Sequence, residues 1–178
     1  MPILLRVVLF SLCLTLLFTG FANLLPQIEG EAEAPLAIST EDEPLRVAAG
    51  EQLFNGKGSC ALCHNSMGRA PDLLAMDVVA SASAQVSDPA YGGLATTAPA
   101  YLYESMVAPS VFVVPGYGIK GSAPPKSPMP DVSAAPISLT EQEMGAIIAY
   151  LQAKDGYRVT PWIVPEALKA LRLGEMQE

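Results

Sequence analysis

Two cysteines and one histidine are the residues whose types and spacing point most directly to chemistry. They form the run Cys60-Ala61-Leu62-Cys63-His64, and His64 is the only histidine among 178 residues. On a short helical turn, two thiols at this spacing can both reach one porphyrin edge and form thioethers with its vinyl groups, while the imidazole points at the iron. The run therefore predicts covalent attachment of haem c through Cys60 and Cys63, with His64 as an axial iron ligand.

Other chemistries of these three residues fit the chain less well. A redox dithiol of the thioredoxin type belongs to a βαβ context, whereas this chain contains 16 prolines and 14 glycines. A zinc site normally needs four nitrogen or sulfur ligands, and only Cys13, inside an apolar run, remains to complete one. A chance match to a short pattern is the last alternative, and the segments that flank the motif argue against it.

Segments on both sides of the motif resemble the class I c-type cytochromes with a single haem. The resemblance covers about residues 45 to 155, and it rests on these segments in this order: Ala49-Gly50-Glu51-Gln52-Leu53-Phe54, Gly68-Arg69-Ala70-Pro71-Asp72-Leu73, Ser127-Pro128-Met129-Pro130-Asp131, and Leu139-Thr140-Glu141 with Ala149-Tyr150-Leu151. It implies a mostly α, class I cytochrome c fold, which is a small helical bundle around one covalent haem. It also implies an electron carrier rather than an enzyme.

The resemblance assigns roles to two residues that follow the motif. In the family, a proline at this distance offers its carbonyl to the ring N–H of the axial histidine, which fixes the tautomer and the ring plane, so Pro71 is expected to hold His64. Arg69 has two interpretations of equal weight. It forms an ion pair with a haem propionate, or it is a solvated side chain.

A proline-rich segment is expected to supply the sixth iron ligand. Seven of the 16 prolines lie in residues 109–136, so this proline strap must run extended rather than helical. Met129, flanked by prolines, is the expected thioether ligand opposite His64. Met106 is expected to face the core, and Met76 has no comparably rigid setting. An open iron and a lysine-ligated iron are the alternatives.

Composition limits the kinds of partner. The formal net charge is −8, and six acidic residues lie within residues 29–43. Nucleic acid is therefore not an expected partner, and the acidic segment is expected to be a solvated linker. Once haem takes two of the three cysteines, no pair is left for a structural disulfide.

The N-terminus carries an apolar run, residues 3–25, whose only charge is Arg6. A helix over residues 7–25 would be roughly 28 Å long, about the hydrocarbon thickness of a bilayer. We expect a retained single-pass transmembrane helix in the cytoplasmic membrane, with Arg6 on the cytoplasmic side and the haem domain on the periplasmic, extracytoplasmic face. The alternative is a cleaved signal peptide, for which residues 32–34 offer an A-x-A pattern, although the run is long and Pro35 would follow the cut.

The sequence divides into four parts. Residues 1–25 are the anchor or signal peptide, residues 26–44 the acidic proline-containing linker, residues 45–156 the cytochrome c domain, and residues 157–178 a C-terminal extension. The extension is either a docking tail or a surface flap. Residues 75–98 are rich in Ala, Ser, Thr and Gly and show no clear period, so they predict no element.

The first helix of the soluble part is expected at residues 44–55, because proline suits an opening turn. One face of it is partly apolar and comprises Leu45, Ala49, Gln52 and Leu53. By the resemblance, Gly50 and Phe54 mark its crossing with a C-terminal helix, with Tyr150 near the crossing.

That C-terminal helix has the clearest signals in the soluble part. Thr140 and Glu143 form a capping box, and Gly156 is expected to end the helix. Its apolar stripe is Met144, Ile147, Ile148 and Leu151. Shorter helices are expected at residues 99–108, where Pro109 stops the helix, and at residues 165–173.

An iron with a histidine and a methionine on its two faces has no vacant position, so electron transfer suits it better than reactions of O₂ or peroxide. The layout of the chain is similar to the monohaem cytochrome subunits of alternative complex III. We therefore expect a subunit of a respiratory or photosynthetic quinol-oxidising complex, with other subunits as redox partners. The alternatives are a free membrane-tethered shuttle and a haem enzyme or gas sensor with an open sixth site.

Overall fold

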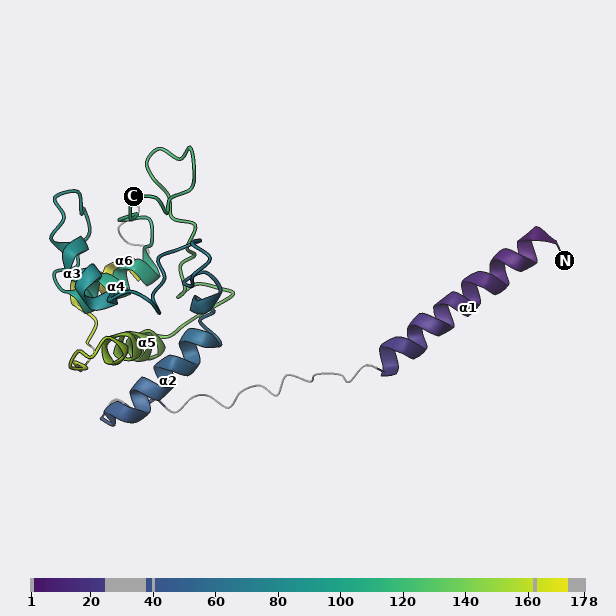
Figure 1. Cartoon of the computed structure of the whole chain (residues 1–178), viewed down its shortest axis with the longest axis horizontal. Coiled ribbons are helices and arrows are strands. Elements are labelled where there is room, and N and C mark those ends of the chain that lie inside the picture. Colours follow the sequence, from purple (N-terminus) through teal and green to yellow (C-terminus); the bar gives the residue numbers. More distant parts are fainter. Residues whose placement is uncertain (1, 25–37, 40, 162, 173–178) are drawn as a thin grey trace. The chain divides into compact units, whose positions relative to one another are not determined.

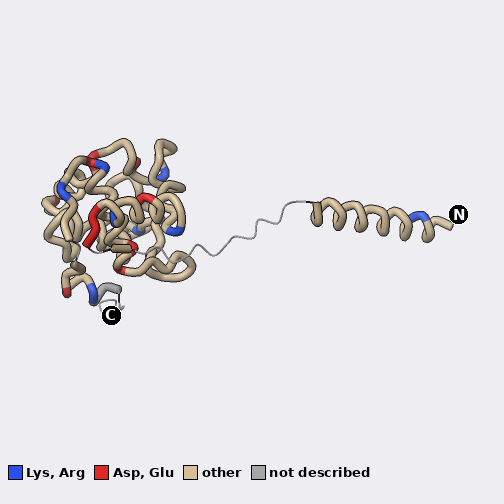
Figure 2. Tube along the Cα trace, turned by 90° about the horizontal axis from the view of Figure 1, so that it is seen from below, with Lys and Arg blue, Asp and Glu red and all other residues tan. Residues whose placement is uncertain are grey.

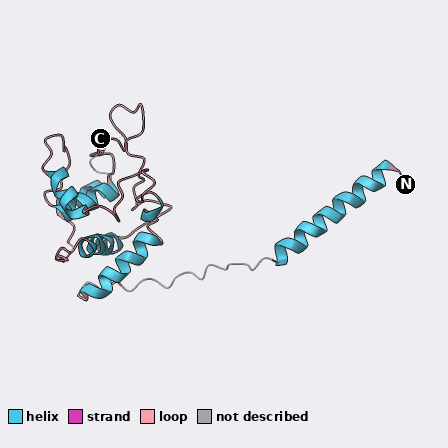
Figure 3. Cartoon of the chain, viewed as in Figure 1, coloured by secondary structure: helices cyan, strands magenta, loops and turns pink. Residues whose placement is uncertain are grey.

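The computed structural model describes residues 2–24, 38–39, 41–161 and 163–172. The chain divides into two compact units, Met1–Leu36 and Ala37–Glu178. Within the described ranges every regular element is a helix and no strand is present (Figure 3). The mostly α fold expected from the sequence is therefore confirmed.

The first unit contains one helix, α1 (Ile3–Leu24), of 22 residues (Figure 1). It carries a single charged residue, Arg6, whereas basic and acidic residues are interspersed along the trace of the second unit (Figure 2). The helix is long and apolar enough to cross a membrane, with a mean hydropathy of 2.2, and a signal sequence near the N-terminus meets the same criterion. Helix α1 lies within the anchor range of residues 1–25, and it begins at the first residue of the apolar run and includes Arg6. Leu25 lies outside the described residues.

Helices α2 (Glu43–Asn55) and α5 (Glu141–Lys154) cross at Gly50. A Cβ atom on Gly50 would lie 2.0 Å from the carbonyl oxygen of Ala146, so only glycine lets the two backbones approach this closely. Beside the crossing, the rings of Phe54 and Tyr150 lie 5.6 Å apart. The crossing predicted at these residues is confirmed.

The predicted apolar face of α2 is only partly right. The buried stripe has the spacing i, i+3, i+4, i+7, i+8 and comprises Arg46, Ala49, Gly50, Leu53 and Phe54. Leu45 and Gln52 lie off this stripe, and both are exposed. At both positions the next residue along the helix faces inward instead: Arg46 rather than Leu45, and Leu53 rather than Gln52.

Local signals set the ends of both crossing helices. The carboxylate of Asp42 caps α2 by accepting a hydrogen bond from the backbone N–H of Leu45 at 3.2 Å. Thr140 and Glu143 form the predicted capping box at the start of α5. Gly156, with φ +77°, follows the end of α5, as expected for a residue that takes the left-handed conformation there. The predicted apolar stripe of α5 is fully buried: Met144, Ile147, Ile148 and Leu151.

Two further helices pack beside this pair. Helix α4 (Ala98–Val107) is capped by Thr97 and buries Leu102 and Met106. Its end before Pro109 and the burial of Met106 agree with the prediction. Helix α3 (Val78–Val86) packs on α4 and α5 and lies in the stretch for which the sequence predicts no element. With only nine residues, many of them Ala and Ser, α3 has too weak an apolar pattern to be recognised.

A buried carboxylate ties the loop before α4 to that helix. Glu104 is only 2% exposed, and it accepts hydrogen bonds from the hydroxyl of Tyr91 and, at 2.7 Å, from the backbone N–H of Leu94. Burial and the bond to Glu104 raise the pKa of Tyr91. The ring of Tyr91 also lies 5.7 Å from that of Tyr101 and 5.5 Å from that of Phe112, so the loop is held by both polar and aromatic contacts.

The C-terminal extension packs against the rest of the second unit. Helix α6 (Glu166–Arg172) lies against α4, close to the predicted range of residues 165–173. Val159, Val164 and Leu168 are buried. The described part of the extension therefore contributes to the core. Trp162 and Leu173 lie outside the described residues.

Candidate haem attachment site

The turn that carries the two thiols begins where α2 ends. The backbone N–H of Gly58 donates to the carbonyl of Leu53 at 2.8 Å, and Ser59 takes a left-handed conformation with φ 53°. A Cβ atom on Gly58 would lie 2.8 Å from that Leu53 carbonyl and 3.2 Å from the Sγ of Cys60. A residue without a side chain at position 58 therefore lets the chain fold back from α2 directly into the motif.

The motif itself forms the 3-10 turn η1 (Cys60–Leu62), which continues to His64. The N–H groups of Cys63 and His64 donate to the carbonyl of Cys60 at 3.2 and 2.9 Å. Both thiols are free; Cys60 is half-buried, and Cys63 is exposed. Burial is the main cause that raises the pKa of Cys60 to about 11, and the nearby Cys63 adds to it while a backbone hydrogen bond opposes it. One tight turn thus presents two unpaired thiols and the imidazole.

The ring of His64 is held by one hydrogen bond. Its Nδ1 lies 2.9 Å from the carbonyl oxygen of Pro71. Because a carbonyl can only accept, Nδ1 carries the proton, and Nε2 keeps its lone pair for another partner. Burial lowers the pKa of His64, while the bond to Pro71 acts in the opposite direction. The imidazole is therefore neutral, and the lone pair of Nε2 is available to a metal. This is the form of histidine that ligates iron.

A hollow of about 360 Å³ lies next to Pro71, the residue that accepts the hydrogen bond from His64. Its lining combines apolar and polar residues: Pro71, Asp72, Ala75, Met76, Ser81, and Val114 and Tyr117 of the proline strap. The proline strap contains no helix, as predicted. Two free thiols on one turn and an imidazole with Nε2 available fit a covalently bound haem c.

Met129 lies in the proline strap and is half-buried. Its backbone N–H donates to the hydroxyl of Ser127 at 3.1 Å, and the N–H of Ser127 donates to the hydroxyl of Ser110 at 3.1 Å. A few residues later, the N–H of Val132 donates to the carbonyl of Met106 at 3.0 Å, which ties the proline strap to the end of α4. The region around Met129 is therefore anchored, and its ligation of iron stays a prediction.

The remaining site residues are placed as follows. Arg69 is exposed, which is compatible with either of its two interpretations. Met106 is buried in the core, as expected.

The expectation that Met76 lacks a rigid setting is wrong. The backbone N–H of Met76 donates to the carbonyl of Asp72 at 3.1 Å, and its carbonyl accepts from Nζ of Lys154 at 3.1 Å. Sequence reasoning missed Lys154 because this contact spans 78 positions.

A helical bundle with an α2–α5 crossing, a C-x-x-C-H turn after α2 and a histidine held by a backbone carbonyl define a c-type cytochrome. The family model for cytochrome c matches residues 47–154, more than half of the chain. The chain therefore belongs to the cytochrome c family, whose members bind haem c covalently and transfer electrons. No curated protein matches the chain.

Proposed function

We propose that this protein is a monohaem electron carrier in which Cys60 and Cys63 bind the haem and in which His64 and Met129 ligate its iron. The observation that carries the proposal is the 2.9 Å hydrogen bond from Nδ1 of His64 to the carbonyl of Pro71, next to two free thiols on the same turn. Because Nδ1 carries the proton, Nε2 of the only histidine in the sequence keeps its lone pair and can ligate iron.

Different residues of the chain have different roles toward the haem. When bound, haem c supplies a one-electron couple at its iron. Cys60 and Cys63 tether the group, and Pro71 holds the imidazole of His64 in one tautomer. A thioether from Met129 favours the reduced state relative to a more basic ligand, and so raises the reduction potential.

The proposal extends to the membrane. Helix α1 would be about 33 Å long at 1.5 Å per residue, enough to cross the hydrocarbon core. Two of its polar side chains donate to the helix's own carbonyls, Thr15 to Ser11 and Asn23 to Thr19, both at 2.9 Å, so neither needs a partner from water. Arg6 at the N-terminal end favours a cytoplasmic N-terminus and a haem domain on the periplasmic, extracytoplasmic side.

We further propose that the anchored chain serves as a subunit of a respiratory or photosynthetic quinol-oxidising complex, similar in layout to the monohaem subunits of alternative complex III. Purification of the native protein in mild detergent tests this proposal. Co-migration with quinol-oxidising subunits is the expected result. A lone monomer would favour the free tethered shuttle, and a cleaved N-terminus found by mass spectrometry would remove the anchor.

The axial ligand is tested by Met129→Ala in the full-length haem-loaded protein. We expect loss of the long-wavelength band that methionine–iron ligation gives, a lower reduction potential, and binding of carbon monoxide at the vacated position. The matched control is Met67→Ala, which removes an exposed methionine close to the motif and should leave all three unchanged.

Three outcomes would contradict the assignment. If Met129→Ala leaves the spectrum and potential unchanged, Met129 is not the ligand. If Met76→Ala abolishes the band instead, the methionine that lines the hollow is the ligand. If the wild-type protein binds carbon monoxide readily, the sixth site is open, and a haem enzyme or gas sensor becomes the better account.

A further inference from the structure

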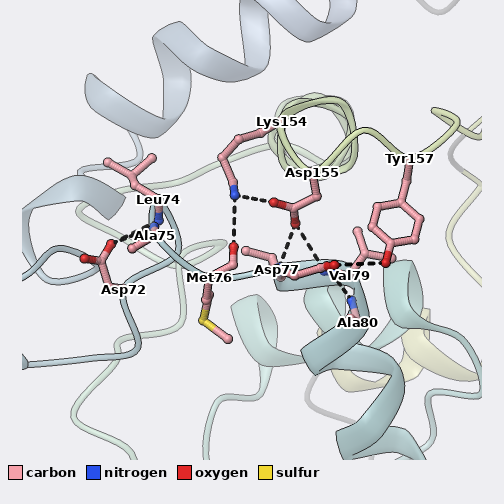
Figure 4. Close-up of polar contacts among 11 residues, drawn as sticks. Asp72, Leu74, Ala75, Met76, Asp77, Val79, Ala80, Lys154, Asp155 and Tyr157 are labelled. Atoms are coloured by element: carbon pink, nitrogen blue, oxygen red, sulfur yellow. Dashed lines mark hydrogen bonds and ion pairs between the residues drawn. The ribbon is translucent and has the colours of Figure 1, made fainter.

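Two residues at the end of α5 reach across to the segment that follows the haem motif (Figure 4). Lys154 donates from Nζ to the carbonyl of Met76 at 3.1 Å. Oδ2 of Asp155 accepts hydrogen bonds from the backbone N–H groups of Val78 at 2.7 Å and Val79 at 3.3 Å, the first two residues of α3. The C-terminal end of α5 is thus joined to the N-terminal end of α3 by side chain–backbone hydrogen bonds.

The start of the same segment contacts the axial histidine. Residues 72–76, which directly follow Pro71, form a hydrogen-bonded turn, in which Oδ1 of Asp72 accepts from the N–H groups of Leu74 at 3.1 Å and Ala75 at 3.2 Å. The carbonyl of Asp72 accepts from Met76 at 3.1 Å. These bonds couple Met76 to Asp72, and Asp72 is bonded directly to the Pro71 carbonyl that holds His64.

Burial distinguishes this pair from the other ion pairs of the described residues. Lys154 and Asp155 contact each other, and their side chains are only 18% and 5% exposed. In the pair of Lys169 and Glu166, the side chains are 40% and 86% exposed. A surface pair contributes little, whereas removing one partner of a buried pair leaves a charge and its hydrogen-bonded groups uncompensated.

A second contact also connects the end of α5 to the start of α3. The hydroxyl of Tyr157, just after α5, donates to Oδ2 of Asp77 at 3.0 Å, while Oδ1 of Asp77 accepts from the N–H of Ala80 at 2.8 Å. Asp77 and Asp155 together satisfy the N–H groups that the first turn of α3 leaves open. The position of α3 and of the segment before it is therefore set by α5.

We propose that Lys154 and Asp155 are positioning residues for the haem site. They hold the 71–78 segment so that the carbonyl of Pro71 keeps its bond to His64 and the side chain of Met76 keeps its place in the wall of the hollow. A ligating imidazole becomes more basic when its second N–H is held by an acceptor, so this segment tunes the reduction potential. The inference rests on the proposed function, since it requires His64 to ligate the haem iron.

The experiment is Lys154→Met in the full-length haem-loaded protein. Two quantities are measured: the reduction potential, and the exchange rate of the His64 Nδ1 proton by nuclear magnetic resonance. We expect exchange about tenfold faster, because the loss of a hydrogen bond from a charged donor changes a local opening equilibrium by at least about that factor. We also expect a higher potential, because a less basic imidazole stabilises the oxidised state less.

The matched control is Lys169→Met, which removes the lysine of the exposed pair and should leave both quantities at wild-type values. Lys154→Arg keeps the charged donor and should restore most of the wild-type behaviour. If Lys154→Met accumulates poorly with haem, Asp155→Asn provides the second variant. The amide oxygen of the variant can still accept from the backbone N–H of Val78. We therefore expect smaller increases in the proton exchange rate and in the reduction potential.

The outcomes separate this inference from the proposed function. A wild-type protein without a haem spectrum overturns the proposed function itself. A normal wild-type protein, with variants at positions 154 and 155 that match the Lys169→Met control in potential and proton exchange, overturns the inference. That conclusion would hold even if the variants melt at a lower temperature, because a merely structural role lowers stability without moving either quantity.

Discussion

The two sides of the candidate haem site are held in different ways. On the histidine side, the segment that carries Pro71 is fixed by side chains from α5, which lies far away in sequence. On the methionine side, Met129 is fixed mainly from within the proline strap, through Ser127 and Ser110, and by one backbone bond to the end of α4. The comparison teaches that the histidine side depends on helix packing, whereas the methionine side depends on local loop chemistry.

The largest expected effect comes from disturbing the packing on which the histidine side depends. Gly50→Ala places a Cβ atom 2.0 Å from the carbonyl oxygen of Ala146, so α2 and α5 must separate. We expect a loss of about 3 kcal/mol in the free energy of unfolding, at the upper end of the range for overpacked sites. Denaturant unfolding of the haem-loaded protein measures it.

Gly92→Ala is the control for that substitution, since nothing lies within 4 Å of a Cβ atom built there. It should change the unfolding free energy by less than about 0.5 kcal/mol. Equal stability of the two variants would show that the close α2–α5 crossing is not needed, and the contrast between the two sides of the site would then lose its basis.

A smaller effect is expected on the methionine side. Ser127→Ala removes the hydroxyl that accepts from the backbone N–H of Met129. We expect a loss of about 1 kcal/mol, the ordinary value of one hydrogen bond, confined to the proline strap. It should be visible as faster carbon monoxide binding to the reduced protein, with the exchange rate of the His64 ring proton unchanged. Faster exchange at His64 would mean that the two sides are not held independently.

The smallest effect concerns the partly exposed ion pair of Lys57 and Glu143 at the start of α5. Burial would raise the pKa of Glu143, but hydrogen bonds from Lys57 and Thr140 outweigh it and hold the pKa below its ordinary value of 4.5. The stabilisation is therefore complete above about pH 4.5 and is lost as the pH falls through the pKa of the folded protein.

Lys57→Met should accordingly lower stability by about 0.5 kcal/mol at neutral pH, as expected for a surface pair, and should reduce the loss of stability on acidification. Unfolding free energies measured between pH 3 and pH 7 test this. An acid dependence identical to that of the wild-type protein would show that Lys57 does not set the pKa of Glu143.

Local signals and the family resemblance explain what could be predicted from sequence. The capping box at Thr140 follows from a short pattern, whereas the crossing at Gly50 and the hydrogen bond between His64 and Pro71 follow from the resemblance to class I cytochromes. Each of them is present in the structure. The role of Pro71 in haem binding, like those of Cys60, Cys63, Arg69 and Met129, stays a prediction.

What could not be predicted depends on contacts between distant residues. Helix α3 has little apolar pattern of its own, and its start is fixed by Asp155, 77 positions from Val78. The rigid setting of Met76 likewise depends on Lys154. Glu104 reads as a surface residue in sequence, yet Tyr91 and Leu94 make its burial possible. Pairing of this kind leaves no periodic signal.

The most direct test of the account is the intact mass of the full-length protein after maturation in cells that attach haem c, measured under conditions that strip non-covalent haem. The account predicts the polypeptide plus the mass of one haem, and no added haem in a Cys60→Ser, Cys63→Ser double variant. A wild-type mass without haem, or a double variant that still carries it, would contradict the account.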